Sequence, residues 1–351
     1  MDHERSISSL SEPWHEILQY ARMAPSPHNI QSWRFAILSA RKLLLQYDPE
    51  RLLPGTDPSG RFCTVGFGIL CEFISIAAAP LGWDIEIEFL TKRLDPGHDR
   101  HGCPYATLTL VPRQSAETLD RELILRRRTS RLPYYDEPVS TYLLVELQTI
   151  AEQYGHYLEY SSEPAQVTWV VRLNAATMFY DMADPVARRE VGGWIRFGEA
   201  EAKRRKDGLS SLAMGFPAWL MKLFVNDNWL FNLPGIHELA IALYTRSMRG
   251  TRTVAWLSGP FEEHDHWFAA GRMLGRLWLT MTREGVYLHP FGSVITNPRA
   301  HQSMCEHFSD VGRVDDIWLL VRLGKSETPP SAERMGLEKL IDREDNVRDG
   351  I

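Results

Sequence analysis

The densest group of residues able to bind an anion is RRRTSR, at positions 126–131. Arginine side chains hold phosphate through pairs of parallel hydrogen bonds, and the hydroxyls of Thr129 and Ser130 can complete such a site. The segment also follows a stretch in which Leu119 and Leu123 have helical spacing, and the C-terminal end of a helix favours positive charge. The residues alone therefore allow two interpretations, a phosphate site or a solvated basic helix end.

A second polar segment, APSPHNIQSWRF at positions 24–35, lies between a predicted helix and a predicted strand. Pro25 and Pro27 fix the backbone, whereas Ser26 and Asn29 offer hydrogen-bond donors and acceptors. Such a rigid edge suits a planar, polar heterocycle. A polar loop that ends a helix has the same composition, so the segment by itself does not distinguish a binding site from a connection.

Other residues with possible catalytic or ligand chemistry give weaker patterns. His289 is a candidate proton donor, although a histidine in such a position is more often structural. Residues 262–266, EEHDH, are of metal-ligating types, but His264 and His266 are two positions apart and cannot share a helical face. We interpret this cluster as a charged helix start and predict no metal site.

Composition excludes several classes of protein. A net charge of −6 over 351 residues provides no basic field for nucleic acid. The four cysteines show neither a Cys-x-x-Cys spacing nor the density of a disulfide scaffold, so we expect a reducing cytoplasm. The apolar run Gly208–Met221 is interrupted by Pro217 and is too short for a membrane span. Gly66 and Gly68 lack the spacing of a Rossmann nicotinamide site.

Periodicity predicts a protein of mixed α and β structure. Helical spacing of apolar residues occurs at about 14–21, 65–81, 119–123, 143–151 and 262–283. Strand-like runs occur at 34–39, 43–47, 83–89, 106–111, 167–171, 253–258 and 317–323. Residues 175–250 show mainly helix and loop signals.

Two parts of the chain share one pattern. In each, a long apolar helix is closed by a glycine, Gly82 or Gly285, and a strand follows that ends near Pro112 or Leu323. The similarity suggests a duplicated unit. A helix followed by a glycine and a strand is also a common arrangement, so the pattern alone leaves duplication open.

Together these motifs resemble those of the FMN-dependent nitroreductases, and among them the long-chain, single-site Acg-like branch. In that family a segment A-P-S-x-x-N-x-Q-P-W-R-F follows the first helix, and residues 24–35 depart from its named positions only at Ser32, where proline is usual. A pattern R-R-S/T-x-R, which holds the FMN phosphate and ribityl chain, is matched by residues 127–131.

The resemblance implies further flavin contacts. The helix beginning near Ala269 and the loop after it look like the family's helix and loop whose backbone amides face the flavin. The segment LGKSETPPSAERM resembles a C-terminal loop that returns a basic residue to the phosphate. The implied FMN-binding residues are Pro25, Ser26, Pro27, Asn29, Arg127, Arg128, Thr129, Arg131, Phe291, Gly292, Ser293 and Arg334.

The order of the motifs implies a fused pseudo-dimer of α+β, nitroreductase-like fold. The first half has the APSPHN segment without an arginine motif before it, and the second half has the reverse, so one complete FMN site is expected. The two related halves, each with an antiparallel-containing sheet flanked by helices, are predicted at 1–120 and at 121–183 with 251–351. Residues 184–250 form a helical insertion, either a lid over the flavin or additional core or dimer contact.

The function implied by the resemblance is that of an FMN-dependent oxidoreductase, which passes a hydride through flavin N5 to or from a small organic substrate, with NAD(P)H as a possible donor. No side chain is required as acid or base. The alternatives are an FMN-binding or flavin-sequestering protein without turnover, and an FMN dehydrogenase of natural-product biosynthesis. We expect a monomer or a homodimer, without nucleic acid.

Overall fold

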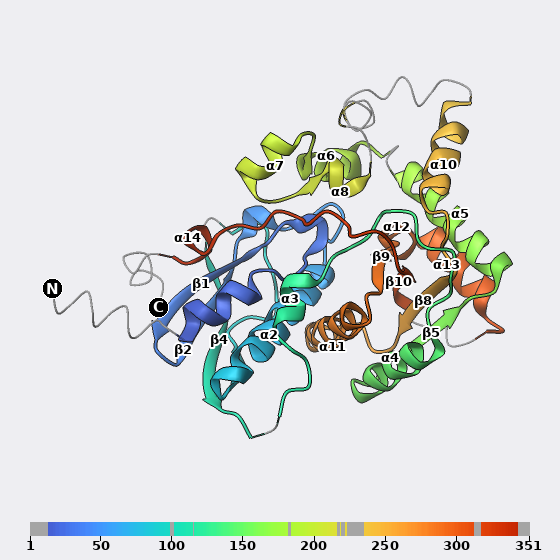
Figure 1. Cartoon of the computed structure of the whole chain (residues 1–351). Helices are drawn as coiled ribbons and strands as arrows, with labels where there is room; N and C mark the ends of the chain where they lie inside the picture. Colours follow the sequence, from blue (N-terminus) through green and yellow to red (C-terminus); the bar gives the residue numbers. More distant parts are fainter. Residues whose placement is uncertain are drawn as a thin grey trace. The chain divides into compact units, whose positions relative to one another are not determined.

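The structure, a computed structural model, falls into two units that we describe separately (Figure 1). The first unit comprises Met1–Arg126, Glu262–Arg276 and Arg334–Ile351, and the second comprises Arg127–Phe261 and Leu277–Glu333. The predicted boundaries at residues 120, 183 and 250 stay predictions. The structure describes residues 13–98, 102–114, 116–181, 184–215, 218, 222, 235–311 and 317–342.

The first unit contains a four-stranded antiparallel sheet of order β1-β2-β4-β3. Its strands are β1 (Trp33–Ser39), β2 (Lys42–Tyr47), β3 (Trp83–Phe89) and β4 (Cys103–Pro112). Its helical segments are a helix at 13–21, η1 (Pro27–Asn29), η2 (Pro49–Arg51), α2 (Arg61–Ala78), η3 (Ala79–Leu81), α3 (Glu122–Arg126) and α14 (Leu337–Leu340). The sequence predicted these four strands and the long helix α2.

Helix α2 forms much of the core of this unit. Sixteen of its residues are buried, and it packs against β3 and η1. Asp57 Oδ2 accepts a hydrogen bond from Cys63 N at 2.9 Å, and Gly82, at φ 80°, ends the helical region in the left-handed conformation. By length and composition alone, residues 61–81 could also cross a membrane, at mean hydropathy 1.9; however, 89% of the tested window is buried within the protein, as in a core helix.

The second unit contains another four-stranded antiparallel sheet, of order β5-β8-β10-β9. Its strands are β5 (Tyr157–Ser161), β8 (Thr253–Ser258), β9 (Tyr287–Pro290) and β10 (Ile317–Gly324). Its helices include α4 (Thr141–Gln153), α5 (Pro164–Asp181), α12 (Gly292–Thr296) and α13 (Pro298–Phe308). Helix α11 (His264–Arg283) belongs to the first unit up to Arg276 and to the second from Leu277.

The two sheets have the same topology. In chain order, each sheet places its strands first, second, fourth and third. In each, a long helix joins the second strand to the third, namely α2 before β3 and α11 before β9, and a glycine with positive φ follows the helix. The predicted α+β fold with two related, sheet-containing halves is therefore confirmed.

The connection between the first two strands differs most between the sheets. β1 and β2 are joined by a tight turn at Ala40 and Arg41, whereas β5 is separated from β8 by residues 162–252. This long connection contains α5, α6 (Pro185–Gly193), β6 (Ile195–Arg196), α7 (Glu199–Arg205), β7 (Leu209–Ser210), α8 (Ser211–Met214) and α10 (Ile236–Ser247). This connection stands where the first sheet has a tight turn, and it includes residues 184–250, whose role as an insertion stays a prediction. Part of the apolar run at 208–221 lies outside the described residues.

One predicted strand is wrong. Residues 167–171 form part of helix α5, which begins at Pro164, a residue favoured in the first helical turn. Val167, Val170 and Val171 are all buried, and their spacing of three and four positions matches a helix face. A short apolar run of β-branched residues does not distinguish strand from helix until its neighbours are known. The sequence also missed β5 and β9.

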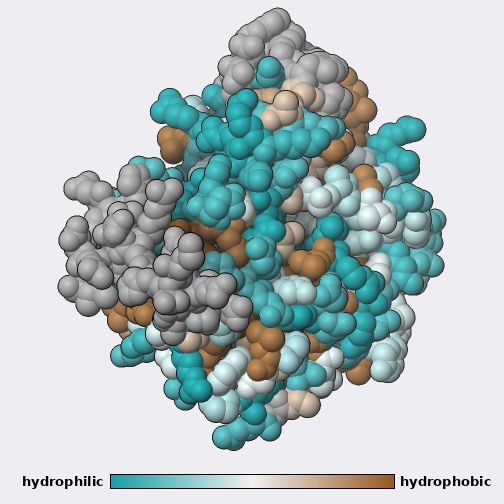
Figure 2. Space-filling view, turned by 60° about the vertical axis from the view of Figure 1, so that its left-hand side comes forward, coloured by the Kyte–Doolittle hydropathy of each residue, from teal (hydrophilic) through white to brown (hydrophobic). Residues whose placement is uncertain are grey.

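The surface of the described residues carries scattered apolar side chains. Figure 2 shows one face on which hydrophobic residues lie in small groups among hydrophilic ones. Exposed examples include Tyr142, Val186, Leu239 and Leu243. Scattered exposure of this kind is normal for a folded protein and marks no site by itself.

Candidate functional site

The arginine segment runs beside strand β9 in the second unit. Thr129 forms an isolated parallel bridge with Leu288, and Ser130 N donates to Leu288 O at 3.2 Å. Ser130 is fully buried, and its Oγ lies 2.8 Å from Ser326 Oγ, within hydrogen-bond distance. The segment is therefore fixed to the sheet and is not a solvated helix end.

The first two arginines of the motif are held by Trp278 of α11. The Arg127 guanidinium, buried with 5% of the residue exposed, lies 4.4 Å from the Trp278 ring centroid, a cation–π distance. Trp278 Nε1 donates to Arg128 O at 3.4 Å, and Arg128 Nη1 donates to Arg127 O at 2.9 Å. Burial lowers the pKa of Arg128, and Tyr287 partly opposes this shift.

Arg131 differs from these two. Among the described residues, its guanidinium has no hydrogen-bond or ion-pair partner. Burial is the main cause that lowers the pKa of Arg131; Tyr244 opposes this, and the like charge of Arg322 adds to it. Arg131 is partly exposed in the folded protein. A positive charge in such a position, beside a second positive charge, is costly unless an anion compensates it. The position is therefore suited to a negatively charged ligand.

His289, the weak catalytic candidate, is buried on β9. Its Nδ1 accepts a hydrogen bond from Arg322 Nε at 3.1 Å. Burial, together with the charges of Arg322 and Arg131, holds the pKa of His289 well below its usual range. The ring is therefore neutral at neutral pH, which favours a structural role over that of a proton donor.

The loop expected to present backbone amides begins helix α12. Phe291 N donates to Leu320 O at 2.8 Å, so this amide is occupied by strand β10. Gly292 and Ser293 lie in the first turn of α12, where backbone N–H groups have no partner within the helix. Only these two of the three expected amides can serve a ligand.

The APSPHNIQSWRF segment lies in the first unit and is rigid. His28, Asn29 and Gln31 all have positive φ, between 47° and 56°. Ser26 Oγ accepts a hydrogen bond from Gln31 N at 2.9 Å, and this bond closes the turn. Three non-glycine residues in the left-handed region represent backbone strain, which is commonly found at functional sites.

Arg334 also lies in the first unit, and its neighbour Met335 is hydrogen-bonded to this turn. Met335 N donates to Gln31 Oε1 at 2.9 Å, and Arg22 Nη1 donates to Met335 O at 3.1 Å. Ser32, where the family usually has proline, is buried, and its carbonyl accepts a hydrogen bond from Asp48 N at 2.7 Å. The departure at Ser32 therefore leaves the turn well ordered.

The site prediction missed several side chains around the motif. Trp278 was included only in the apolar face of a predicted helix. Arg322 carried a signal that could have been used, because it is the one charged residue in the apolar stretch IWLLVRL. Tyr244, buried near Arg131, gave no signal, because only the fold brings α10 to the motif.

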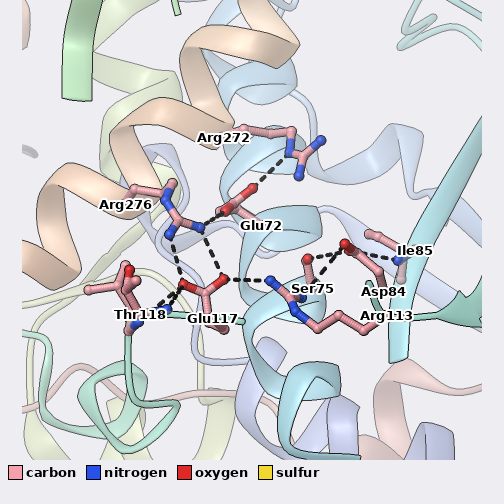
Figure 3. A network of polar contacts seen from close by, with 10 residues as sticks. Glu72, Ser75, Asp84, Ile85, Arg113, Glu117, Thr118, Arg272 and Arg276 are labelled. Carbon is pink, nitrogen blue, oxygen red and sulfur yellow. Dashed lines mark hydrogen bonds and ion pairs between the residues drawn. The ribbon is translucent and has the colours of Figure 1, made fainter. Parts of the chain in front are cut away.

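A separate ionic network in the first unit is structural (Figure 3). Glu72, buried on α2, accepts hydrogen bonds from Arg272 Nε at 2.7 Å and Arg276 Nη1 at 2.6 Å. Arg276 also binds Glu117 at 2.8 Å, and Arg113 binds Glu117 at 3.1 Å. A shallow hollow of about 590 Å³ is lined in part by Arg113 and Glu117 of this network and contains none of the predicted flavin residues.

Comparison with known proteins bears on the predicted resemblance to nitroreductases. No family profile matches the chain. The chain is 25% identical over 309 residues, 82% of each protein, to PigM of Serratia sp., named as a probable NAD(P)H nitroreductase. It is 33% identical over 124 residues, 34% of this chain and 35% of the relative, to acg of Mycobacterium tuberculosis, named as a candidate NAD(P)H nitroreductase. The predicted resemblance to nitroreductases is confirmed by these relatives.

Solved structures of similar proteins were also found. The FMN-dependent nitroreductase NfnB from Mycobacterium smegmatis, in complex with NADPH, is 15% identical, with 63% of this chain and 96% of that chain covered and a TM-score of 0.41. A candidate nitroreductase from Anabaena variabilis is 11% identical, with 82% and 69% covered and a TM-score of 0.41.

Proposed function

We propose that this protein is an FMN-dependent oxidoreductase that transfers a hydride between NAD(P)H and a small organic substrate. The observation that carries the proposal is the Arg131 guanidinium in a motif matching R-R-S/T-x-R, which has no partner among the described residues. The names of PigM and acg as NAD(P)H nitroreductases support both the enzyme class and the hydride donor.

The residues of the motif fit a phosphate group. Arg131 supplies an uncompensated positive charge, and each hydrogen bond between a guanidinium and a phosphate contributes about 1.5–3 kcal/mol. Arg127, Arg128 and Thr129 would complete the cradle on a backbone that is hydrogen-bonded to Leu288. We therefore assign the FMN phosphate to residues 127–131.

The other predicted residues have orienting roles under this proposal. Gly292 and Ser293 would direct backbone N–H groups towards the flavin, whereas Pro25, Ser26, Pro27 and Asn29 would form a rigid polar edge. Arg334 would add a further cation to the phosphate. That these residues serve the same flavin rests on the sequence argument that each half contains the motif the other lacks. Bound FMN would supply the hydride chemistry at N5, so the chain needs no acid or base of its own.

Flavin binding is tested first. The purified protein should bind one FMN per chain, and Arg131→Ala should weaken FMN binding by about tenfold or more. The affinity for riboflavin, which lacks the phosphate, should change by less than about twofold. Arg283→Ala, in an exposed ion pair with Glu146, is the matched control. A protein that takes up no FMN, or an Arg131→Ala variant with unchanged FMN affinity, would refute the assignment.

Turnover is tested second. Anaerobic addition of NADPH should bleach the absorbance band of the bound flavin. Bleaching only by an organic substrate would instead indicate the FMN dehydrogenase. A flavin that stays oxidised with either would indicate a flavin-sequestering protein.

A further inference from the structure

Arg322 is a charged residue within the apolar strand β10, and its side chain is buried with 0% of the residue exposed. Among the described residues, no carboxylate lies within ion-pair distance of its guanidinium. A buried charge without an opposite charge is costly and persists only where hydrogen bonds satisfy it. The hydrogen-bond partners of Arg322 therefore indicate the role of this buried charge.

Two of its hydrogen bonds hold the end of the arginine segment. Arg322 Nη2 donates to Leu132 O at 3.0 Å and to Ser130 O at 3.5 Å. Tyr134, whose ring centroid lies 4.2 Å from the Arg322 guanidinium carbon, also donates its hydroxyl to Ser130 O at 3.2 Å. Arg131 lies between these two carbonyl groups in the chain. The contacts of Arg322 thus fix the backbone on both sides of the residue whose guanidinium has no partner.

A third hydrogen bond fixes the protonation of His289. A guanidinium only donates, so His289 Nδ1, 3.1 Å from Arg322 Nε, must be the acceptor, and the ring proton lies on Nε2. Arg322 Nη1 donates to Thr251 Oγ1 at 3.1 Å. Every partner of Arg322 is therefore a neutral acceptor, and its positive charge adds to that of Arg131.

We propose that Arg322 is a positioning residue for the flavin phosphate, which shapes the backbone around Arg131 and holds His289 as a neutral ring with its proton on Nε2. The inference rests on the proposed function, because the phosphate is the ligand that this geometry would serve. Arg322 need not touch the flavin itself. Its expected contribution is to the preference for FMN over riboflavin.

The first test compares flavin affinities of the full-length protein. Arg322→Gln should weaken FMN binding about tenfold or more, and riboflavin binding by less than about twofold. Arg322→Lys keeps the charge but not the planar fork, so it should also lose most of the FMN preference. Arg283→Gln is the control outside the motif. If Arg322→Gln lost affinity for FMN and riboflavin to the same extent, or lost affinity for neither, the inference would be overturned. Failure of the wild-type protein to bind FMN would instead refute the proposed function.

The second test needs neither flavin nor a folded variant of Arg322. Nitrogen-15 NMR of histidine-labelled, flavin-free protein should show His289 with an unprotonated Nδ1 and a protonated Nε2, assigned by the loss of its signals in His289→Asn. A proton on Nδ1 would contradict the hydrogen bond to Arg322 and overturn the inference. In Arg322→Gln, if it folds, we expect a shift of the His289 Nδ1 signal, whereas an unchanged signal would likewise contradict the contact.

Discussion

Gly68 on α2 and Gly271 on α11 lie where the two helices cross, and each faces the backbone of the other helix. A Cβ atom on Gly68 would lie 2.2 Å from Phe268 O, and a Cβ atom on Gly271 would lie 2.2 Å from Val65 O. Val65 and Phe268 each stand three positions before the glycine of their own helix. The contact is therefore reciprocal, and each helix brings a glycine against the backbone of the other.

This crossing predicts a difference between two glycines of the same helix. Gly68→Ala should destabilise the protein by about 1–3 kcal/mol or more, because backbone atoms would have to move apart. Gly66→Ala is the control, since its Cβ would lie 3.8 Å from its nearest neighbours and alanine favours a helix. Urea unfolding measures both. Equal stabilities of the two variants would show that the helices do not approach closely at Gly68.

The ionic network predicts a sizeable cost for removing its central carboxylate. Glu72→Gln should lower the free energy of unfolding by about 1–3 kcal/mol, because Arg272 and Arg276 both lose their ion pair with this buried carboxylate. Glu284→Gln, in an exposed pair with Arg283, should cost at most about 1 kcal/mol. Similar midpoints of urea unfolding for the two variants would argue against a structural role for the network.

His289 predicts a dependence of stability on pH. Its folded-state pKa is lowered, so below about pH 6.5 the unfolded chain binds more protons than the folded protein. The stabilisation from neutral His289 is present above that pH and is lost as the pH falls, by up to about 1.4 kcal/mol per pH unit. Unfolding at pH 7.5 and 5.5 should therefore show a larger loss for the wild type than for His289→Asn. The same loss in both proteins would assign the pH dependence to other groups.

The hydrogen bond between Gln31 and Met335 should anchor the segment that follows Arg334. Gln31→Ala removes the acceptor for Met335 N and leaves a buried amide without its partner, a loss of about 1–3 kcal/mol. Amide exchange in residues 334–342 should accelerate, while exchange in β10 stays slow. Gln302→Ala, which removes only an exposed contact to Glu306, should leave both regions unchanged. Unaltered exchange at Met335 in Gln31→Ala would contradict the anchoring.

The sequence by itself determined the features that depend on short-range order. The periodicity of α2 and α11, the alternation in β3 and the glycines that end both helices are local properties, and all were predicted correctly. The two motif segments were also recognisable, because their residue types occur at fixed, short spacings. Even the related halves could be suspected, since the same helix, glycine and strand occur twice.

The tertiary structure decided which residues, distant in sequence, lie close to these segments. Residues 167–171 became a helix because the valines face a buried surface that only the folded unit provides. Arg131 and Arg322 lie far apart in sequence, so their shared surroundings, without a carboxylate among the described residues, could not be read from spacing. Burial and charge compensation depend on long-range contacts, and these distinguish a basic helix end from a site prepared for an anion.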